Sequence, residues 1–314
     1  MFMIEEGVNP MTLRMQIYSV LPTILEELKK LSKPVKSNAE ISQVAYISSG
    51  SHEIGDMVAK AVAKVGKDGL VTADEGQLDT EVEYTEGMEF DKGYLSPYFV
   101  TNMSRLEAII HDPIIALIDK KLTLNTEIVP LLERMAQISK DIVIIAEDVT
   151  GDALATIAAN KMKGNINAVA LAVPGIGDNK KNYLEDMSVL TGGKVISDQS
   201  NVDIQADTTW VGRAKQVIAS RESTVIIGGA GEPAEIKKRI EDLRTRKKDE
   251  KSKFEKEKIE ERLARLSTGI AVIHVGAKTE IDMREKVERV KDAIGAATAA
   301  EEEGVIPGGG TIFL

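Results

Sequence analysis

The chain has 314 residues, a formal net charge of −10, and 43% hydrophobic and 29% charged residues, which is typical of a globular protein with two or three domains. Its lack of cysteine excludes disulfides, thiol nucleophiles and cysteine-bound zinc. No apolar run approaches the roughly 18 residues that a membrane helix needs, and the start lacks a basic, cleavable leader. We therefore expect no membrane partner, and a cytoplasmic location in a bacterium or an organelle matrix. The negative charge also disfavours nucleic acid as a partner.

Two amphipathic helices are predicted near the start of the chain. Asn9 is suited to be an N-cap, Pro10 to occupy the first helical position, and the apolar pattern that follows should end before Pro34. A second apolar pattern begins at residue 51 and ends at Gly66. Two short strands are then predicted in the stretches "GLVTADEG" and "TEVEYTEG".

Between Gly87 and Gly269 the sequence alternates between strand and helix patterns. The apolar runs "IIALID", "DIVIIAED" and "NAVALAV" are typical of strands that are buried on both faces. The stretches "EIVPLLERMAQIS" and "TGDALATIAANKMKG" between and after them predict helices. Such βαβ units indicate a partly parallel sheet, so the predicted fold class is mixed α/β.

The last third of the chain is predicted to hold a hairpin, three helices and a further strand. An antiparallel hairpin should turn near Arg221 and Glu222, and two charged helices with narrow apolar stripes should follow Pro233. The stretch "GIAVIHVG" predicts a strand. Thr279, with Asp282 three residues later, predicts the start of a final helix.

One short stretch concentrates aromatic side chains. Residues 86–102, "EGMEFDKGYLSPYFVTN", hold four of the chain's twelve aromatic residues. Gly87, Gly93 and Pro97 interrupt any regular helix or strand there. These rings therefore cannot all lie on one face of a regular core element, and a binding role is an alternative to a place in the core.

Several blocks of the sequence, taken together and in order, resemble the group I chaperonins of the GroEL type, the 60 kDa chaperonins. The resemblance extends from Gly7 to Gly310. It is carried by "GVNPMTLRMQI", "GMEFDKGYLSPYFVTN", "IIAEDVTGDALATIAANKM", "VPGIGDNKK", "LEDMSVLTGGKVIS" and "ARLSTGIAVIHVGAKTEIDMREKVERVKDAIGAATAAEEEGVIPGGG".

This resemblance implies a division into equatorial, intermediate and apical domains, with only the edges of the equatorial domain present. The implied segments are an equatorial remnant at 1–33 and 305–314, an intermediate domain at 34–86 and 270–304, and an apical domain at 87–269. Hinges are implied where these segments join. The matching positions are Pro34, Gly87, Gly269 and Gly304.

The resemblance also implies an apical surface that captures non-native polypeptides and a GroES-type co-chaperonin. The matching residues are Tyr94, Tyr98, Phe99, Val129, Leu132, Leu154, Ala158 and Ala159. Members of the family commonly carry valine where this chain has Ala158 and Ala159, which predicts a wider or weaker groove. From helical spacing alone, these apolar side chains would be assigned to a core. Phe90 is expected to remain in the core.

For nucleotide chemistry, the resemblance implies a role for Asp292 in orienting the water that attacks ATP, and a role for Gly308 and Gly309 beside the nucleotide. The family uses ATP with Mg. The family's other phosphate-binding and magnesium-binding motifs are not found in this sequence, so we expect no tight nucleotide binding by this chain alone, and whether it is an ATPase stays open.

The function that the resemblance implies is that of a molecular chaperone. The family assembles as a double heptameric ring, whereas this chain alone is compatible with a monomer. Two alternatives stay open: a mini-chaperone that works without nucleotide, and, with less support, a freestanding α/β enzyme that uses Asp292, or Glu147 and Asp148, on a phosphate ligand near Gly308.

Overall fold

The computed structural model describes residues 9–35, 37–66, 69–198, 204, 208–267 and 269–311. The chain divides into two compact units. Unit 1 is formed by Met1–Lys67, Val71–Glu83 and Val272–Leu314, and unit 2 by Asp68–Leu70 and Tyr84–Ala271. Unit 2 contains the whole of the predicted apical segment, 87–269, together with short parts of the predicted intermediate segments, and the rest of the chain falls in unit 1. The division into three domains stays a prediction. The ends of the equatorial segments, residues 1–8 and 312–314, lie outside the described residues.

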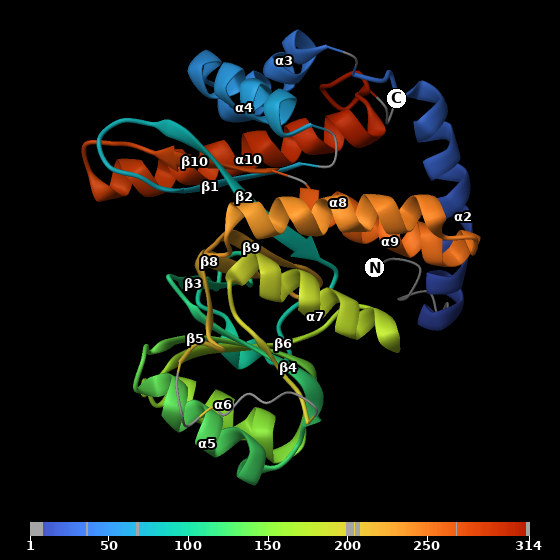
Figure 1. Cartoon of the computed structure of the whole chain (residues 1–314). Helices are drawn as coiled ribbons and strands as arrows, with labels where there is room; N and C mark the ends of the chain where they lie inside the picture. The colour runs from blue at the N-terminus through green and yellow to red at the C-terminus, as the bar shows by residue number, and fades with distance from the viewer. Residues whose placement is uncertain are drawn as a thin grey trace. The chain divides into compact units, whose positions relative to one another are not determined.

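Unit 1 is largely helical. Its elements are α2 (Pro10–Leu31), α3 (Asn38–Ser49), α4 (His52–Val65), β1 (Leu70–Glu75), the first part of β2 (Glu81–Phe90), the last part of β10 (Gly269–Val275) and α10 (Glu280–Glu303). Helices α3, α4 and α10 pack together, as Figure 1 shows. Their apolar faces form the core of this unit, with Val58, Ala45 and Ala293 fully or almost fully buried.

The helix starts and ends of unit 1 follow from local chemistry. Asn9 caps α2 by accepting a hydrogen bond from the N–H of Met11 at 2.9 Å, and Thr279 caps α10 through the N–H of Asp282 at 3.1 Å. The helix α3 was not predicted, although the Ser37 and Glu40 side chains form a capping box at its start. This capping box is the signal in the sequence that marks the start of α3.

The two outer segments of unit 1 meet beside α10. The backbones of Lys33 and Val305 form an antiparallel bridge, with N–O distances of 2.8 and 2.9 Å. Gly304 ends α10 with a φ of +82°, and a Cβ there would lie 2.4 Å from Oγ of Ser32. Glycine is therefore required at this position both by its backbone conformation and by the close approach.

Unit 2 is built on a mixed sheet. Its strands are the end of β2, β3 (Ala108–His111), β4 (Ile114–Leu122), β5 (Asp141–Val149), β6 (Asn167–Ala172), β7 (Val195–Ile196), β8 (Gly212–Ala219) and β9 (Thr224–Gly229). Strands β4, β5 and β6 are parallel neighbours, and β7 also pairs with β4 in parallel. Antiparallel pairs join β2 to β9, β9 to β8, and β8 to both β3 and β4.

The sheet of unit 2 forms its core. Residues Ile114–Ile118 of β4 and Ile142–Ala146 of β5 are all buried, as expected for strands covered on both faces. Phe90 is fully buried, as predicted. The predicted β8–β9 hairpin is also confirmed, with Ala219 paired to Thr224 across the turn. The mixed α/β fold class is therefore confirmed.

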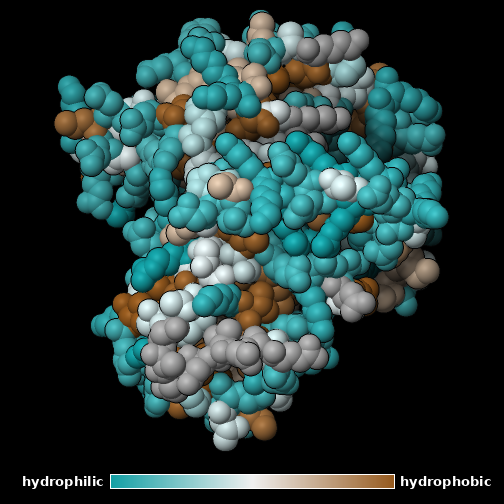
Figure 2. Space-filling view, viewed as in Figure 1, coloured by the Kyte–Doolittle hydropathy of each residue, from teal (hydrophilic) through white to brown (hydrophobic). Residues whose placement is uncertain are grey.

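The helices of unit 2 are α5 (Asn125–Ala136), α6 (Gly151–Met162), α7 (Asp178–Thr191), α8 (Pro233–Asp249) and α9 (Lys253–Ser267), together with the short helix η1 (Pro97–Phe99). The predicted charged pair, α8 and α9, is present, and Figure 2 shows hydrophilic side chains over it on the face displayed. Asp186 of α7 joins this pair to the core. Its buried carboxylate accepts hydrogen bonds from Nε of Arg239 at 2.8 Å and Nε of Arg262 at 2.7 Å.

Candidate functional site

Helices α5 and α6 are placed side by side by the sheet beneath them. Each follows one of the two neighbouring parallel strands, β4 and β5, and right-handed connections put both helices on one face of the sheet. Figure 1 shows the two helices next to one another. The Thr156 hydroxyl donates to Oδ1 of Asn125 at 2.6 Å, which ties α6 to the start of α5. The faces of these helices therefore lie on a fixed scaffold.

The apolar residues predicted on these two helices have different degrees of exposure. Val129, Leu154 and Ala159 are half-buried, so part of each side chain is open to solvent. Leu132 and Ala158 are buried, with exposed fractions of 6% and 5%. For these two residues, placement in an exposed patch is wrong, because their side chains pack into the core of unit 2.

The aromatic stretch is fixed against the same part of unit 2. The N–H of Tyr94 donates to the carbonyl of Ser220 at 3.0 Å, and the Tyr94 backbone also bridges to Leu171 of β6. Gly93 is needed for this approach, because a Cβ there would lie 2.2 Å from the Ser220 carbonyl oxygen. Gly93 and Tyr94 thus attach the stretch to the sheet.

The turn η1 separates two adjacent aromatic rings. Tyr98 has an exposed fraction of 62%, whereas Phe99 has 0% and lies in the core. Tyr98 is therefore exposed, as a place on the capturing surface requires, whereas exposure of Phe99 was wrongly predicted. The reason is the tight turn, which sends consecutive side chains in different directions. The binding role of Tyr98 stays a prediction. Tyr94, also assigned to this patch, is half-buried.

Lys161 holds the turn η1 against α6. Its ammonium donates to the carbonyl of Phe99 at 2.7 Å and to the carbonyl of Ala168 in β6 at 3.2 Å. Burial of the ammonium lowers the pKa of Lys161 to about 8, and the nearby Asp141 carboxylate opposes that shift. The helix, the turn and the sheet are therefore joined by one side chain that the sequence analysis did not single out.

We define the α5–α6 surface as Tyr98, Val129, Leu154 and Ala159. Other large apolar side chains that the prediction missed are exposed on the adjoining segments: Met103, Leu106, Leu124 and Met162. Leu124 stands at the N-cap of α5 and Met162 is the last residue of α6. No sequence pattern marked them, because single apolar residues in loops and at helix ends have no periodicity.

The residues predicted to handle nucleotide lie in unit 1, and their surroundings do not fit ATP and Mg. Asp292 is exposed on α10. Gly308 and Gly309 are exposed, and no atom lies within 4 Å of a Cβ built on either, so their backbone lines no tight cradle. Among the described residues, no group of three or more His, Cys, Asp or Glu could hold a metal ion. Among the described residues, the two glycines therefore give a phosphate no close backbone cradle, and the nucleotide roles stay predictions.

The carboxylates considered for an enzyme are also occupied structurally. Glu147 accepts the Lys180 ammonium at 3.2 Å, and Asp148 accepts the N–H of Val149 at 2.9 Å. Glu147 is also 4.0 Å from the Lys121 ammonium. Glu147 is therefore paired with lysines, whereas the partner of Asp148 is a backbone N–H, and these contacts account for both side chains as parts of the fold.

The predicted hinge glycines differ in their packing. A Cβ at Gly87 would lie 2.1 Å from Cδ1 of Ile270 and 2.4 Å from the Ile226 carbonyl oxygen. Close packing alone therefore explains this glycine. Gly269 has no atom within 4 Å of a built Cβ, and Pro34 follows the Lys33–Val305 bridge. The hinge roles stay predictions.

The sequence matches the model of the TCP-1/cpn60 chaperonin family over residues 2–314, which is almost the entire chain. In the part of the chain that the structure describes, no helix is both long and apolar enough to cross a membrane.

Proposed function

The chain belongs to the TCP-1/cpn60 chaperonin family and is therefore a chaperone, and we propose that it captures non-native polypeptides on the α5–α6 surface of unit 2. The observation that carries this proposal is the exposure of Tyr98 next to helices whose inner faces are locked into the core. A non-native chain exposes apolar side chains, and a rigid surface with part-exposed apolar groups can bind them without first ordering itself.

The energetics predict weak capture by each copy of the surface. Burying one apolar side chain against a ligand contributes about 1.5–3 kcal/mol before the costs of ordering the ligand are subtracted. Three or four partly exposed side chains therefore bind one segment loosely. A ring of several copies would raise the effective concentration of the surface and hold one client at several points. We propose such a ring, a double heptamer, for the assembled protein.

The remaining steps of the proposed cycle involve ATP and a co-chaperonin. The resemblance to the GroEL-type chaperonins implies that ATP with Mg supplies the energy for client release in an assembled ring, and Asp292 is the residue of this chain that matches the family's water-orienting carboxylate. A carboxylate suits that role, and Asp292 is exposed on α10 rather than packed in the core. Among the described residues, Gly308 and Gly309 form no tight cradle for a phosphate. A GroES-type co-chaperonin would compete with clients for the α5–α6 surface and cover it. We place these events in the cytoplasm or an organelle matrix.

Capture without nucleotide is a second candidate function. Every residue of the α5–α6 surface lies in unit 2, whereas Asp292, Gly308 and Gly309 lie in unit 1. Unit 2 also has a hydrophobic core of its own. The chain could therefore bind clients when no nucleotide is present, as a mini-chaperone does.

An aggregation assay on the full chain tests the proposal. A chemically unfolded client is diluted into buffer with the chain and without nucleotide, and light scattering is followed. Leu154→Glu and Tyr98→Glu should each abolish most of the protection, because a carboxylate cannot be buried unpaired against an apolar client. Leu78→Glu, at an exposed leucine of unit 1, is the matched control and should protect like the unaltered chain. Full protection by Leu154→Glu and Tyr98→Glu would refute capture on this surface.

Calorimetry with ATP and Mg separates the two candidate functions. If the chain works as a mini-chaperone, heat of binding should be absent while aggregation is still suppressed. Submicromolar ATP binding by this chain would contradict the inference from the open surroundings of Gly308 and Gly309.

A further inference from the structure

Unit 2 contains a concave site that is separate from the α5–α6 surface. Its volume is about 700 Å³, within the range of pockets that bind small ligands or a few residues of a peptide. Its lining comes from the residues after β2, the segment before α7, the face of α7 and the first turns of α9. None of the residues of the α5–α6 surface lines it.

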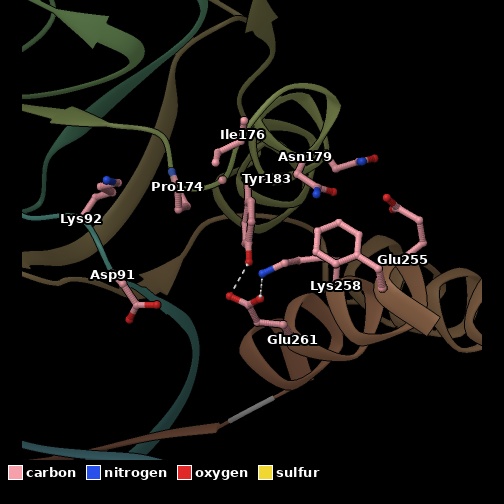
Figure 3. Close-up of a pocket in the computed structure, with 12 residues that line it drawn as sticks. Asp91, Lys92, Pro174, Ile176, Asn179, Tyr183, Glu255, Lys258 and Glu261 are labelled. Carbon is pink, nitrogen blue, oxygen red and sulfur yellow. Dashed lines mark hydrogen bonds and ion pairs between the residues drawn. The ribbon is translucent and has the colours of Figure 1, made fainter. Parts of the chain in front are cut away.

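The floor of this pocket is closely packed, and its polar groups are hydrogen-bonded to one another. Tyr183 is buried, and its hydroxyl donates to Oε1 of Glu261 at 3.1 Å, as Figure 3 shows. The Lys258 ammonium donates to the other oxygen of Glu261 at 2.8 Å. Burial of the ring raises the pKa of Tyr183 well above its usual value, so the hydroxyl keeps its proton. The floor therefore gives a ligand a surface to pack against, and it presents neither a reactive group nor an unpaired charge.

Two large apolar side chains line the pocket and are open to solvent. Ile176, in the segment before α7, has an exposed fraction of 89%, and Phe254, at the start of α9, has 61%. Exposed apolar residues are ordinary when scattered singly. These two differ because they line one concavity, together with Pro174 and the Tyr183 ring.

The same pocket has uncommitted polar groups. Asn179 and Asn182, three residues apart on α7, both line it, and among the described residues their side-chain amides form no hydrogen bond. Each amide has donors and an acceptor to offer, the complement of a peptide group. An extended peptide could therefore satisfy both amides through its backbone.

The uncompensated charges of the pocket are one of each sign. Glu261 is paired with Lys258, and Asp91 is paired with Arg265. Among the described residues of unit 2, Lys92 and Glu255 form no ion pair, and Figure 3 shows them on opposite sides of the pocket. A strongly charged ligand such as a nucleotide would be repelled by the pocket residue whose charge has the same sign as its own. A neutral chain with an acidic group near Lys92 and a basic group near Glu255 would complement both.

We propose that this pocket binds an extended peptide segment in which one aliphatic residue is flanked by an acidic residue on one side and a basic residue on the other. The aliphatic side chain lies between Ile176 and Phe254, the backbone bonds to the amides of Asn179 and Asn182, and the flanking charges pair with Lys92 and Glu255. This proposal rests on the proposed client capture. It adds a second site of contact with the client, and this site prefers a particular sequence of charged and aliphatic residues, which a purely apolar surface does not.

Methyl NMR of the full chain with a defined probe tests the site directly. The probe is the capped peptide Gly-Asp-Ser-Leu-Ser-Lys-Gly, and the control peptide has Asp and Lys exchanged with Leu retained. The probe should shift the methyl resonances of Ile176 and leave those of Leu154 in place. The control peptide should bind about threefold more weakly or worse, since exposed ion pairs contribute only about 0.2–1 kcal/mol each. Asn182→Ala should weaken the probe about fivefold through a lost hydrogen bond.

Two outcomes would overturn the proposal. One is a shift of Leu154 alone, which would place the peptide on the α5–α6 surface. The other is the absence of any Ile176 shift at millimolar peptide. The aggregation assay distinguishes a failure of this proposal from a failure of the proposed client capture. We expect Ile176→Glu to lower protection by less than Leu154→Glu does, while Ile281→Glu, at an isoleucine of 82% exposure in unit 1, leaves it unchanged. If Leu154→Glu loses protection and Ile176→Glu retains all of it, client capture stands and this pocket has no part in it.

Discussion

Helix α2 in unit 1 and the α5–α6 surface in unit 2 both present apolar side chains, but in different ways. Helix α2 buries none of its residues in the described structure, and it exposes Met15, Tyr18, Ile24 and others. Helices α5 and α6 bury one face completely, through Ile128, Met135 and Ile157, and expose only part of the opposite face. Helix α2 therefore exposes more large apolar side chains, whereas the side chains of the α5–α6 surface are held in place by the structure beneath them.

If clients bind the α5–α6 surface as proposed, exposure alone does not identify a client-binding surface. A client gains about as much by covering an exposed isoleucine on α2 as by covering Tyr98. What distinguishes the α5–α6 surface is its support: the sheet fixes both helices, Thr156 ties them together, and Lys161 anchors the adjacent turn. Preorganised groups lose less entropy on binding, so the same buried area yields more affinity.

The largest effect that tests this support is expected at Phe99. Phe99→Ala should lower the free energy of unfolding of unit 2 by about 3–5 kcal/mol, because it leaves a cavity in a packed core. Tyr98→Ala, one residue earlier and 62% exposed, should change it by less than about 0.5 kcal/mol. Urea unfolding followed by far-UV circular dichroism measures both. Similar losses for the two variants would show that the turn does not separate a core ring from a surface ring.

The next effect is expected at Asp186, which joins α7 to α8 and α9. Asp186→Asn should lower the stability of unit 2 by about 3 kcal/mol, since Arg239 and Arg262 would keep their charges without the buried carboxylate. The matched control is Glu185→Gln, which removes only the exposed partner of Arg239 and should cost less than about 1 kcal/mol. Equal losses in urea titrations would mean that the buried position of Asp186 is unimportant.

A smaller, pH-dependent effect is expected from Lys161. Its pKa is about 8 in the folded chain and near 10.5 when the residue is fully hydrated, so the folded state releases this proton first as pH rises. Between these values the unfolded state binds more protons, and stability contributed by this group should increase with pH. Lys161→Met should flatten that increase. Measurement between pH 8 and pH 10 stays below the range in which Tyr183 would titrate; a parallel slope in both proteins would refute the assignment.

The smallest effect is expected on α2. Ile24→Ser should change the free energy of unfolding by less than about 0.5 kcal/mol, because the isoleucine is half exposed and packs against no core in the described structure. Thermal unfolding of the full chain measures this. A loss above about 1 kcal/mol would show that α2 is supported as firmly as α5 and α6 are, and would remove the contrast between the two regions.

Much of the fold could be predicted from the sequence, because its elements have strong local signals. The buried strands β4, β5 and β6 are continuous apolar runs, and α4 starts at Ser51 and stops at Gly66 as its caps require. The helix α3 was missed although two sequence signals mark it: the Ser37–Glu40 capping box, and the helical spacing of Ile41 and Ala45, which are both buried.

The candidate site was harder to predict, because exposure depends on tertiary packing. Helical spacing put Leu154 and Ala158 on one face, yet one is half-buried and the other buried against the sheet. Tyr98 and Phe99 have the same chemistry, and only the turn between Ser96 and Val100 decides which ring faces solvent. The anchoring role of Lys161 depends on carbonyls 62 and 7 residues away, which no local pattern encodes.

Site-specific photocrosslinking tests the central claim most directly. Benzoylphenylalanine replaces Tyr98 in one sample and Tyr18, of almost equal exposure at 60%, in another, and each full chain is irradiated with the same unfolded client. The account predicts strong crosslinks to the client from position 98 and few from position 18, because only the first stands on a supported surface. Equal crosslinking from the two positions, or none from position 98, would contradict it.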